Sequence, residues 1–175
     1  FHLSEIIPRK QLTITSSVPG EILYVSDFLD NGLVFKKGDL LIQIDSLDYS
    51  IARINAKASL DAAYLDFKMK EADAKRSQEE LEAYGTSKPS ELAMKTPQLK
   101  SSKSLLDAAK ANYKKTVSDL TKTSIYAPFN GRVEINSLEK GMKVSTFDKL
   151  ARIYSVDSYK AEFPISISDL EYLEI

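Results

Sequence analysis

The fold of this chain follows from the stretch Ser124-Ile125-Tyr126-Ala127-Pro128-Phe129-Asn130-Gly131-Arg132-Val133. It contains the β-branched Ile125 and the aromatic Tyr126, which favour a strand, and Pro128 to Gly131 have the composition of a tight turn. Before it, residues 47–122 contain one Gly and two Pro in 76 positions and are rich in Ala, Lys, Glu and Leu. Such a composition is typical of helices. The stretch therefore marks the return from a long helical segment to strands and turns.

The first 45 residues share this strand-and-turn composition. Short strands are predicted at Leu12–Thr15 and Glu21–Val25, and turns at Asp30–Gly32 and Lys36–Gly38. Four positions of this segment recur later in the chain at a constant offset of 109 residues. They are Gly32, Phe35, Leu41 and Ile44, which return as Gly141, Val144, Leu150 and Ile153. A constant offset that places turn Gly on turn Gly favours a duplicated β-motif.

The duplication predicts how the chain is organised. Neither half can bury its own apolar face, so residues 15–45 and 124–156 should pack into one β-sandwich with pseudo-twofold symmetry. Residues 46–123 are then an insertion that leaves the sandwich and returns to it at the same place. The predicted structural turns of the sandwich are at Gly20, Gly32, Gly38, Gly131 and Gly141.

The insertion is predicted to be an antiparallel α-helical hairpin. One apolar stripe of helical period on the first arm consists of Ile51, Ile54, Ala58, Ala62, Leu65, Met69 and Ala72. A second apolar stripe, on the second arm and predicted to pack against the first, consists of Leu99, Leu106, Ala109, Tyr113, Val117 and Leu120. Gly85 suits the left-handed residue that ends the first arm, so the tip is expected at about residues 85–89.

The predicted arms run from Leu47 to Tyr84 and from Pro89 to Lys122. Each is ~55 Å long at the rise of an α-helix. Pro97 either kinks the second arm or starts it late, and the matching arm lengths favour the kink.

The first arm carries a second apolar stripe on roughly the opposite side, which contains Ala56, Leu60, Ala63 and Phe67. A two-helix hairpin can bury only one stripe of each arm. Either these residues are isolated surface positions, or they pack against a neighbouring hairpin in a homo-oligomer.

The sequence offers little material for chemistry. Lys plus Arg total 24 and Asp plus Glu total 25, so a net charge of −1 gives no attraction to nucleic acid. Without Cys and with His2 as the only histidine, disulfides, thiol catalysis and a transition-metal site are not expected. No phosphate-binding or nucleophile-elbow motif is present. We therefore predict no catalytic residues, no metal and no cofactor.

Each half resembles half of a biotinyl or lipoyl carrier domain, which presents a modifiable Lys on the hairpin between its halves. Here residues 45–49 read Asp-Ser-Leu-Asp-Tyr, residues 154–157 read Tyr-Ser-Val-Asp, and the first Lys after Ile44 is Lys57. The scaffold is lipoyl-like but lacks the carrier lysine, which leaves a carrier function as the less favoured alternative.

A lipoyl-like domain split by a long hairpin resembles the membrane fusion protein, or periplasmic adaptor, family, which includes HlyD-like and RND-type members. The resemblance covers about residues 15–170 and is carried by Val18–Ile22, Gly38–Asp45, Ser124–Val133 and Lys140–Val144. It implies an adaptor of a tripartite efflux pump in the periplasm, associated with the inner membrane. The implied partners are an inner-membrane transporter, a TolC-like outer-membrane channel and further copies of the chain in a hexamer. It also implies the absence of catalysis.

The resemblance also implies site residues. The hairpin tip of the family often carries an Arg, a Leu and a Ser that meet the channel. Arg76, Leu81, Gly85 and Ser87 are similar to that pattern, with Leu81 one position late relative to Arg76.

The ends of the chain predict a further domain. The alternation from Tyr159 to Ile167 indicates a strand, and Ser168–Glu171 has the pattern of a capping box. Residues 157–175 are similar to the start of the family's β-barrel domain, and residues 1–14 suit its returning strand. The expected fold is therefore α+β, a lipoyl-like β-sandwich (barrel-sandwich hybrid) split by a helical hairpin, with the start of a truncated barrel. We expect the chain to be a piece of a longer protein.

Three functions remain open at this stage. Hairpin length favours an adaptor of an RND-type pump, with an ABC-type exporter as the alternative partner. A carrier domain lacks its lysine, and a purely structural coiled coil does not account for the 109-residue offset.

Overall fold

The computed structural model describes residues 5–30, 33–85, 94–136, 138–157 and 159–162. The chain divides into two compact units. The β unit comprises residues 1–45 and 122–175, and the hairpin unit comprises residues 46–121. The hairpin unit begins at residue 46, as the predicted insertion does, and ends at residue 121, two residues before the predicted end.

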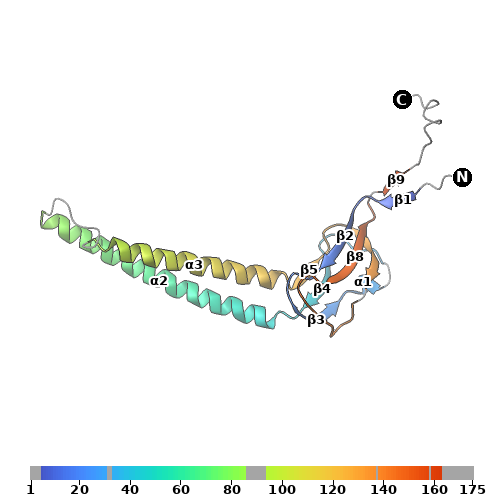
Figure 1. Ribbon diagram of the computed structural model, residues 1–175, viewed down its shortest axis with the longest axis horizontal. Helices are drawn as coiled ribbons and strands as arrows, with labels where there is room; N and C mark the ends of the chain where they lie inside the picture. The colour runs from blue at the N-terminus through green and yellow to red at the C-terminus, as the bar shows by residue number, and fades with distance from the viewer. Residues whose placement is uncertain (1–4, 31–32, 86–93, 137, 158, 163–175) are drawn as a thin grey trace, which may run out of the picture. The chain divides into compact units, whose positions relative to one another are not determined.

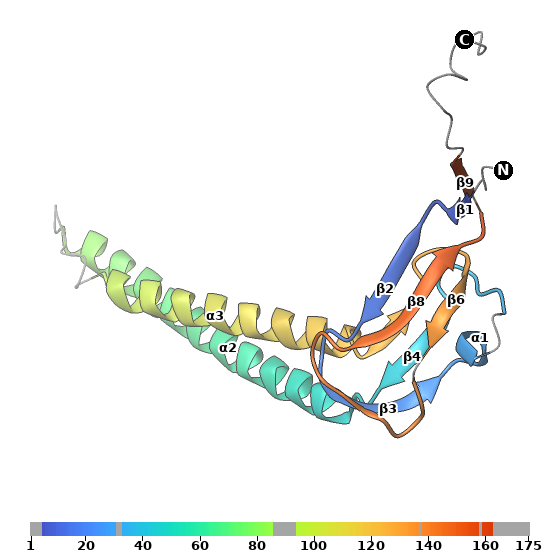
Figure 2. The ribbon, with the colours of Figure 1, turned by 45° about the vertical axis from the view of Figure 1, so that its right-hand side comes forward.

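Two antiparallel sheets build the sandwich of the β unit (Figures 1 and 2). The four-stranded sheet has the order β5 (Ser124–Tyr126), β4 (Leu40–Ile44), β3 (Gly20–Val25) and β7 (Lys143–Val144). The three-stranded sheet has the order β2 (Gln11–Thr15), β8 (Lys149–Ser155) and β6 (Gly131–Asn136). A single helical turn, α1 (Asp27–Asp30), follows β3. Each sheet combines strands from both sequence halves, so the halves fold as one sandwich and the predicted fold class is confirmed.

The core of this unit contains the duplicated positions. Six apolar residues of the 109-residue pattern are buried: Phe35, Leu41, Ile44, Val144, Leu150 and Ile153. Of the glycine pair in this pattern, the structure describes Gly141, whereas Gly32 lies outside the described residues. The apolar matches that indicated a repeat are thus the residues that hold the halves together.

Backbone pairing shows the pseudo-twofold relationship directly. Phe35 and Gly131 exchange two backbone hydrogen bonds, with N···O distances of 2.9 and 3.0 Å. Val144, the equivalent of Phe35, is paired with Gly20, which is the first residue of β3 as Gly131 is the first residue of β6. Each half therefore places a glycine against the apolar residue that follows the turn of the other half.

The insertion leaves and returns at neighbouring strands. Ile44 at the end of β4 donates its N–H to the carbonyl oxygen of Thr123 at 2.8 Å, just before β5. The Gln43 amide donates to the carbonyl oxygens of Ile44 at 2.8 Å and Thr123 at 3.2 Å, and it accepts from Ser124 Oγ at 2.7 Å. This network closes the β unit across the point where the hairpin is inserted.

The terminal segments only partly follow the prediction. Strand β1 (Glu5–Pro8) pairs with β9 (Tyr159–Glu162) in a separate two-stranded sheet. Strand β2 pairs with β8 inside the sandwich, so the assignment of residues 1–14 as a whole to a barrel is wrong for Gln11–Ile14. The physical reason is that Ile14 is buried and completes the sandwich core. The predicted capping box at Ser168–Glu171 lies outside the described residues.

In the hairpin unit, α2 (Leu47–Ala83) packs along α3 (Thr96–Thr121) (Figure 1). Gly85 follows α2 with φ +71° and donates to the carbonyl of Glu82, as predicted for the residue that ends the helix. The favoured kink at Pro97 is wrong, because α3 begins at Thr96 and Pro97 lies in its first turn. A first-turn proline lacks only an N–H that has no helical partner. Helix α3 has 26 residues and is therefore shorter than α2, which has 37.

The two stripes of α2 are exchanged relative to the sequence prediction. Ala56 is buried and Leu60, Ala63 and Phe67 are half-buried, so they lie on the side that packs along α3. The stripe expected inside is on the surface, with exposed fractions of 47–61% for Ile51, Ile54, Leu65 and Met69. Small and large side chains alternate along the buried stripe, which lets a facing helix approach and interdigitate. The predicted stripe of α3 is confirmed, since Leu106 is buried and its other members are half-buried.

Candidate functional site

The described part of the tip is the end of α2 and Gly85. Arg76 is exposed, Leu81 is half-buried, and Ser87 lies outside the described residues. Five residues along an α-helix turn the side chain by about 140°. Arg76 and Leu81 therefore point to different sides of α2, with Leu81 on the α3 side and Arg76 toward solvent. The structure does not bring these two predicted docking residues onto one surface.

Charges near the tip are mostly paired within the helix. Lys75 Nζ lies 3.8 Å from Glu79 Oε1, and the Gln78 amide donates to Glu82 Oε1 at 3.0 Å. Among the described residues, Arg76 forms no ion pair. Its guanidinium group keeps several N–H donors for a partner's carboxylates or carbonyl groups.

A second candidate surface is the exposed stripe of α2, defined here as Ile51, Ile54, Leu65 and Met69. Its members repeat with the same helical period as the buried stripe, so a further helix can pack on it as α3 packs on the other side. Sequence reasoning missed this surface because it assigned these residues to the interior. The signal was present, since two stripes were found and only one could be buried.

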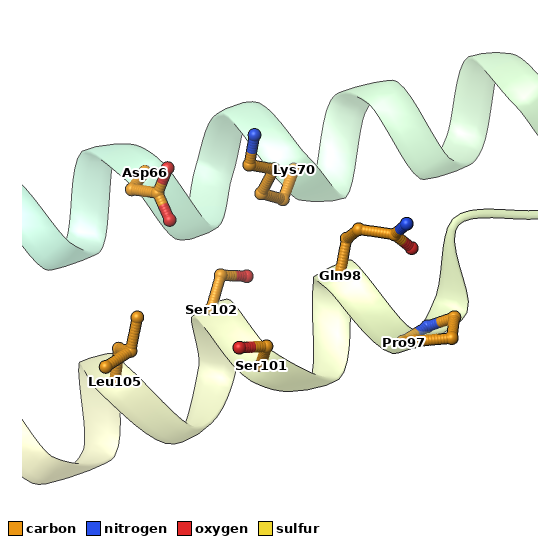
Figure 3. Close-up of a pocket in the computed structure, with 7 residues that line it drawn as sticks. All are labelled: Asp66, Lys70, Pro97, Gln98, Ser101, Ser102 and Leu105. Atoms are coloured by element: carbon orange, nitrogen blue, oxygen red, sulfur yellow. The ribbon is translucent and has the colours of Figure 1, made fainter. Parts of the chain in front are cut away.

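A groove of about 440 Å³ opens between the helices, lined by residues from both arms (Figure 3). Asp66 and Lys70 come from α2, and Pro97, Gln98, Ser101, Ser102 and Leu105 come from α3. Ser102 Oγ already donates to the carbonyl oxygen of Leu99 at 2.9 Å.

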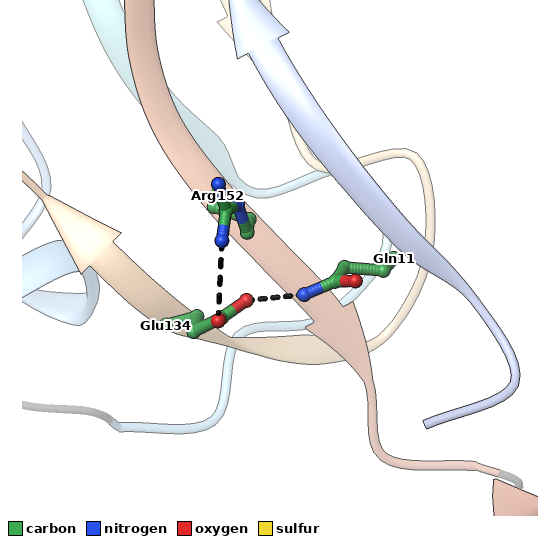
Figure 4. A network of polar contacts seen from close by, with 3 residues as sticks. All are labelled: Gln11, Glu134 and Arg152. Carbon is green, nitrogen blue, oxygen red and sulfur yellow. Dashed lines mark hydrogen bonds and ion pairs between the residues drawn. The ribbon is translucent and has the colours of Figure 1, made fainter. Parts of the chain in front are cut away.

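On the three-stranded sheet, Glu134 accepts from Gln11 and lies 3.4 Å from Arg152 Nη1 (Figure 4). The three residues come from β6, β2 and β8, so this network ties both outer strands to the central one. An exposed ion pair of this kind contributes less than ~1 kcal/mol. Its role is to support the strand register.

The sequence predicts neither a metal site nor a carrier lysine. The described residues contain no group of three or more His, Cys, Asp or Glu side chains that could hold a metal, while His2 lies outside them. Lys57, the first lysine after Ile44, is on α2 and its Nζ lies 2.5 Å from Asp61 Oδ1. It does not occupy a tight hairpin between the two sequence halves, which is where a carrier domain presents its lysine.

These features define a barrel-sandwich hybrid domain interrupted by a helical hairpin, the architecture of periplasmic adaptors. Residues 10–155 match the family model for the barrel-sandwich hybrid domain of RND membrane fusion proteins. The chain therefore belongs to the RND membrane fusion protein family, which is a family of non-enzymatic periplasmic adaptor proteins.

Individual proteins are similar to this chain in sequence or in fold. The chain is 33% identical over 127 residues to YdhJ of Escherichia coli K12, a protein of uncharacterised function, covering 73% of this chain and 43% of YdhJ. The membrane fusion protein Spr0693 from Streptococcus pneumoniae R6 superimposes with a TM-score of 0.66 at 18% identity, over 100% of this chain and 72% of Spr0693. A MacA–MexA chimera with the Pseudomonas aeruginosa MexA α-hairpin gives 0.65 at 20% identity, over 98% and 57%.

The chain spans only about two fifths of the length of the curated relatives that it matches. Within the described residues, neither long helix is apolar enough to cross a lipid bilayer.

Proposed function

We propose that this chain is part of the periplasmic adaptor subunit of a tripartite efflux pump that joins an inner-membrane transporter, of RND type, to a TolC-like outer-membrane channel. Two observations together carry the proposal. The β unit is lipoyl-like but lacks the carrier lysine, and its two halves are separated in sequence by the 37-residue helix α2 and its partner helix α3. We propose that the full protein is associated with the inner membrane.

The hairpin supports a role in reaching a distant partner. Helix α2 places its last residues ~55 Å from its first along the axis. Ordering a long exposed helix costs conformational entropy, and a turn at that distance adds nothing to the core of the β unit. We therefore assign the tip, with Arg76 on its exposed side, to contact with the channel.

The same subunit is proposed to act in a closed homo-oligomer, a hexamer in the assembled pump. The sequence predicts hairpin self-association through Ala56, Leu60, Ala63 and Phe67, but these side chains are buried or half-buried inside the hairpin. We therefore assign hairpin self-association to the exposed stripe of α2, because the packing of α2 on α3 leaves its apolar side chains exposed to solvent.

Site-specific photo-cross-linking in the full-length protein tests these contacts. A photoreactive amino acid at residue 76 is expected to capture the outer-membrane channel, and one at residue 54 a second copy of the adaptor. The mass of the intact protein from its native host should show no lipoyl or biotinyl group. A covalent carrier modification, or a residue-76 probe that never reaches the channel in an active pump, would contradict the assignment.

A further inference from the structure

The groove between α2 and α3 lies where a small residue interrupts the apolar stripe of α3. Ser102 follows Leu99 by three residues and precedes Leu106 by four, so it belongs to that stripe. Its side chain is buried, and its hydroxyl donates to the Leu99 carbonyl of its own helix. The hydroxyl is satisfied locally, and the small side chain leaves open the space that a larger apolar residue would fill.

Two charged residues that line this groove do not pair with each other. Asp66 and Lys70 are four residues apart on α2 with the acid first, which is the more favourable order for an ion pair within a helix. Neither forms an ion pair with another described residue. Lys57 and Asp61, which stand in the less favourable order, do pair at 2.5 Å. The groove therefore holds a carboxylate and an ammonium group that the hairpin itself does not use.

The wall formed by α3 adds uncharged groups. Gln98 and Ser101 line the groove, and their side chains form no hydrogen bond with the rest of the described chain. Pro97 and Leu105 add apolar surface, and Leu105 is 61% exposed. Figure 3 shows these residues on the helix opposite Asp66 and Lys70. Hydrogen-bonding groups, apolar surface and both signs of charge thus meet in one hollow.

Size and charge indicate the kind of molecule that this hollow fits. A volume of about 440 Å³ is in the range of sites that hold small organic molecules. A simple cation or anion would meet one like charge in the groove, whereas a zwitterion can satisfy both charges. Asp66 and Lys70 are ~6 Å apart along the helix axis. The two ends of a dipeptide, ~7 Å apart when extended, span that separation.

We propose that the groove is a binding site for a short zwitterionic peptide with apolar side chains. The ammonium group of the peptide pairs with Asp66 and its carboxylate with Lys70, while its apolar side chains pack on Leu105. The peptide contacts both helices, so its binding stabilises the hairpin. The inference goes beyond the proposed function and depends neither on channel docking nor on the identity of the transporter.

The first test titrates the full-length protein with the dipeptide leucyl-leucine by isothermal titration calorimetry. Asp66→Asn and Lys70→Gln should each weaken binding roughly tenfold, as expected for the loss of one charge-assisted hydrogen bond. Asp61→Asn is the matched control, because it removes an α2 carboxylate that pairs with Lys57 and does not line the groove. Absence of binding to the wild-type protein, or equal binding by the Asp66→Asn variant, would overturn the proposal.

Blocked peptides assign each charge of the ligand. Acetylation of the peptide removes its ammonium group, so the acetylated peptide should bind roughly tenfold more weakly and should not respond to Asp66→Asn. The C-terminal amide lacks the carboxylate and should not respond to Lys70→Gln. If both blocked peptides bind as tightly as leucyl-leucine, the groove does not select a zwitterion and the proposal is wrong.

Ser102 tests the hollow itself. Ser102→Leu fills the space and should abolish binding while raising the unfolding temperature of the hairpin, whereas Ser102→Ala keeps the space and should retain binding. The alternative occupant is another protein chain, and its capture by a photoreactive amino acid at residue 101 in the assembled pump would overturn the proposal. Cross-linking of residue 76 to the channel reports separately on the adaptor assignment. Unchanged peptide binding by Ser102→Leu would show that the peptide binds elsewhere.

Discussion

Gly131 lies so close to Phe35 that a Cβ atom at residue 131 would stand 3.0 Å from Cζ of the Phe35 ring. The same Cβ would also be 3.1 Å from Cε2 of Phe129 and would overlap the carbonyl oxygen of Tyr154. The Tyr154 oxygen belongs to the backbone of a central strand and cannot rotate away. Gly131 is therefore required by close packing at the junction of the two halves.

We expect Gly131→Ala to lower the free energy of unfolding by about 2 kcal/mol, because the new methyl group must displace backbone. Gly141→Ala is the matched control, since residue 141 has φ +89° but no atom within 4 Å of a built Cβ. It should cost only about 1 kcal/mol, from backbone strain alone. Urea unfolding of both variants measures the difference. An equal cost would contradict the steric role of Gly131.

The two faces of α2 give a paired prediction. Phe67→Glu is expected to destabilise the hairpin by about 2 kcal/mol, because it places a carboxylate on the side that packs along α3. Leu65→Glu lies on the exposed stripe and should leave the thermal unfolding of the hairpin, followed by circular dichroism, nearly unchanged. In the full-length protein Leu65→Glu should instead weaken self-association. The opposite pattern would show that the other stripe is on the surface.

For the tip, we expect Arg76→Asp to abolish most efflux while expression, folding and binding to the transporter persist. Loss of a charge-assisted hydrogen bond at a docking contact costs about 1.5–3 kcal/mol of binding free energy. The matched control is Lys75→Asp, which changes the charge by the same amount at a neighbouring residue whose ammonium is paired with Glu79 within the helix. Susceptibility of cells to a pump substrate is the measurement. Full efflux by Arg76→Asp would place the channel contact elsewhere.

Leu81→Ser is expected to act differently from Arg76→Asp. Leu81 is half-buried on the α3 side, so its truncation should loosen the end of α2. Hydrogen exchange of the last turns of α2 should accelerate in Leu81→Ser and stay unchanged in Arg76→Asp. The double variant should then lose efflux through two separate effects. Equal exchange in both single variants would show that Leu81 does not support the tip.

Alkaline pH should weaken the base of the hairpin. Burial and the carboxylates of Asp119 and Asp48 raise the pKa of the Tyr49 phenol above its ordinary value of about 10. Because the folded state holds this proton more tightly, the stabilisation is complete below pH ~10 and is lost as the pH rises through the folded pKa.

Two lysines add an effect of the same sign. A hydrogen bond to Asp61 raises the pKa of Lys57, and one to Glu71 raises the pKa of Lys68. Tyr49→Phe should therefore remove part of the alkaline loss and leave the rest. Melting temperatures measured from pH 8 to pH 11 check this, and an identical slope with and without the Tyr49 phenol would contradict it.

Much of this architecture can be predicted from residue patterns alone. The 109-residue offset identified six buried core residues, and the drop in Gly and Pro content located the hairpin between β4 and β5. Such features are local or periodic, because burial selects apolar side chains and long helices exclude turn residues. The absence of a lysine from residues 45–49, directly after Ile44, likewise needed no coordinates.

Other features depended on tertiary contacts. The position of Pro97 allowed two interpretations, and only the observed start of α3 at Thr96 chose between them. Residues 1–14 looked like one terminal segment, yet β2 joins the sandwich while β1 pairs with β9. Strand pairing is decided by partners distant in sequence, which a local pattern does not identify.

The sequence by itself determined a duplicated β-sandwich interrupted by an amphipathic hairpin. Only the tertiary structure decided which stripe of α2 is buried, because Ala56 to Phe67 and Ile51 to Met69 follow the same helical period and each can accept a facing helix. The choice depends on the rotation of α2 about its axis, which packing along α3 sets as a whole. The tertiary structure also decided that Phe147 has a left-handed backbone conformation, as Gly38 has. The hydrogen bonds of the surrounding turn impose this φ angle, and the apolar pattern of the sequence does not predict it.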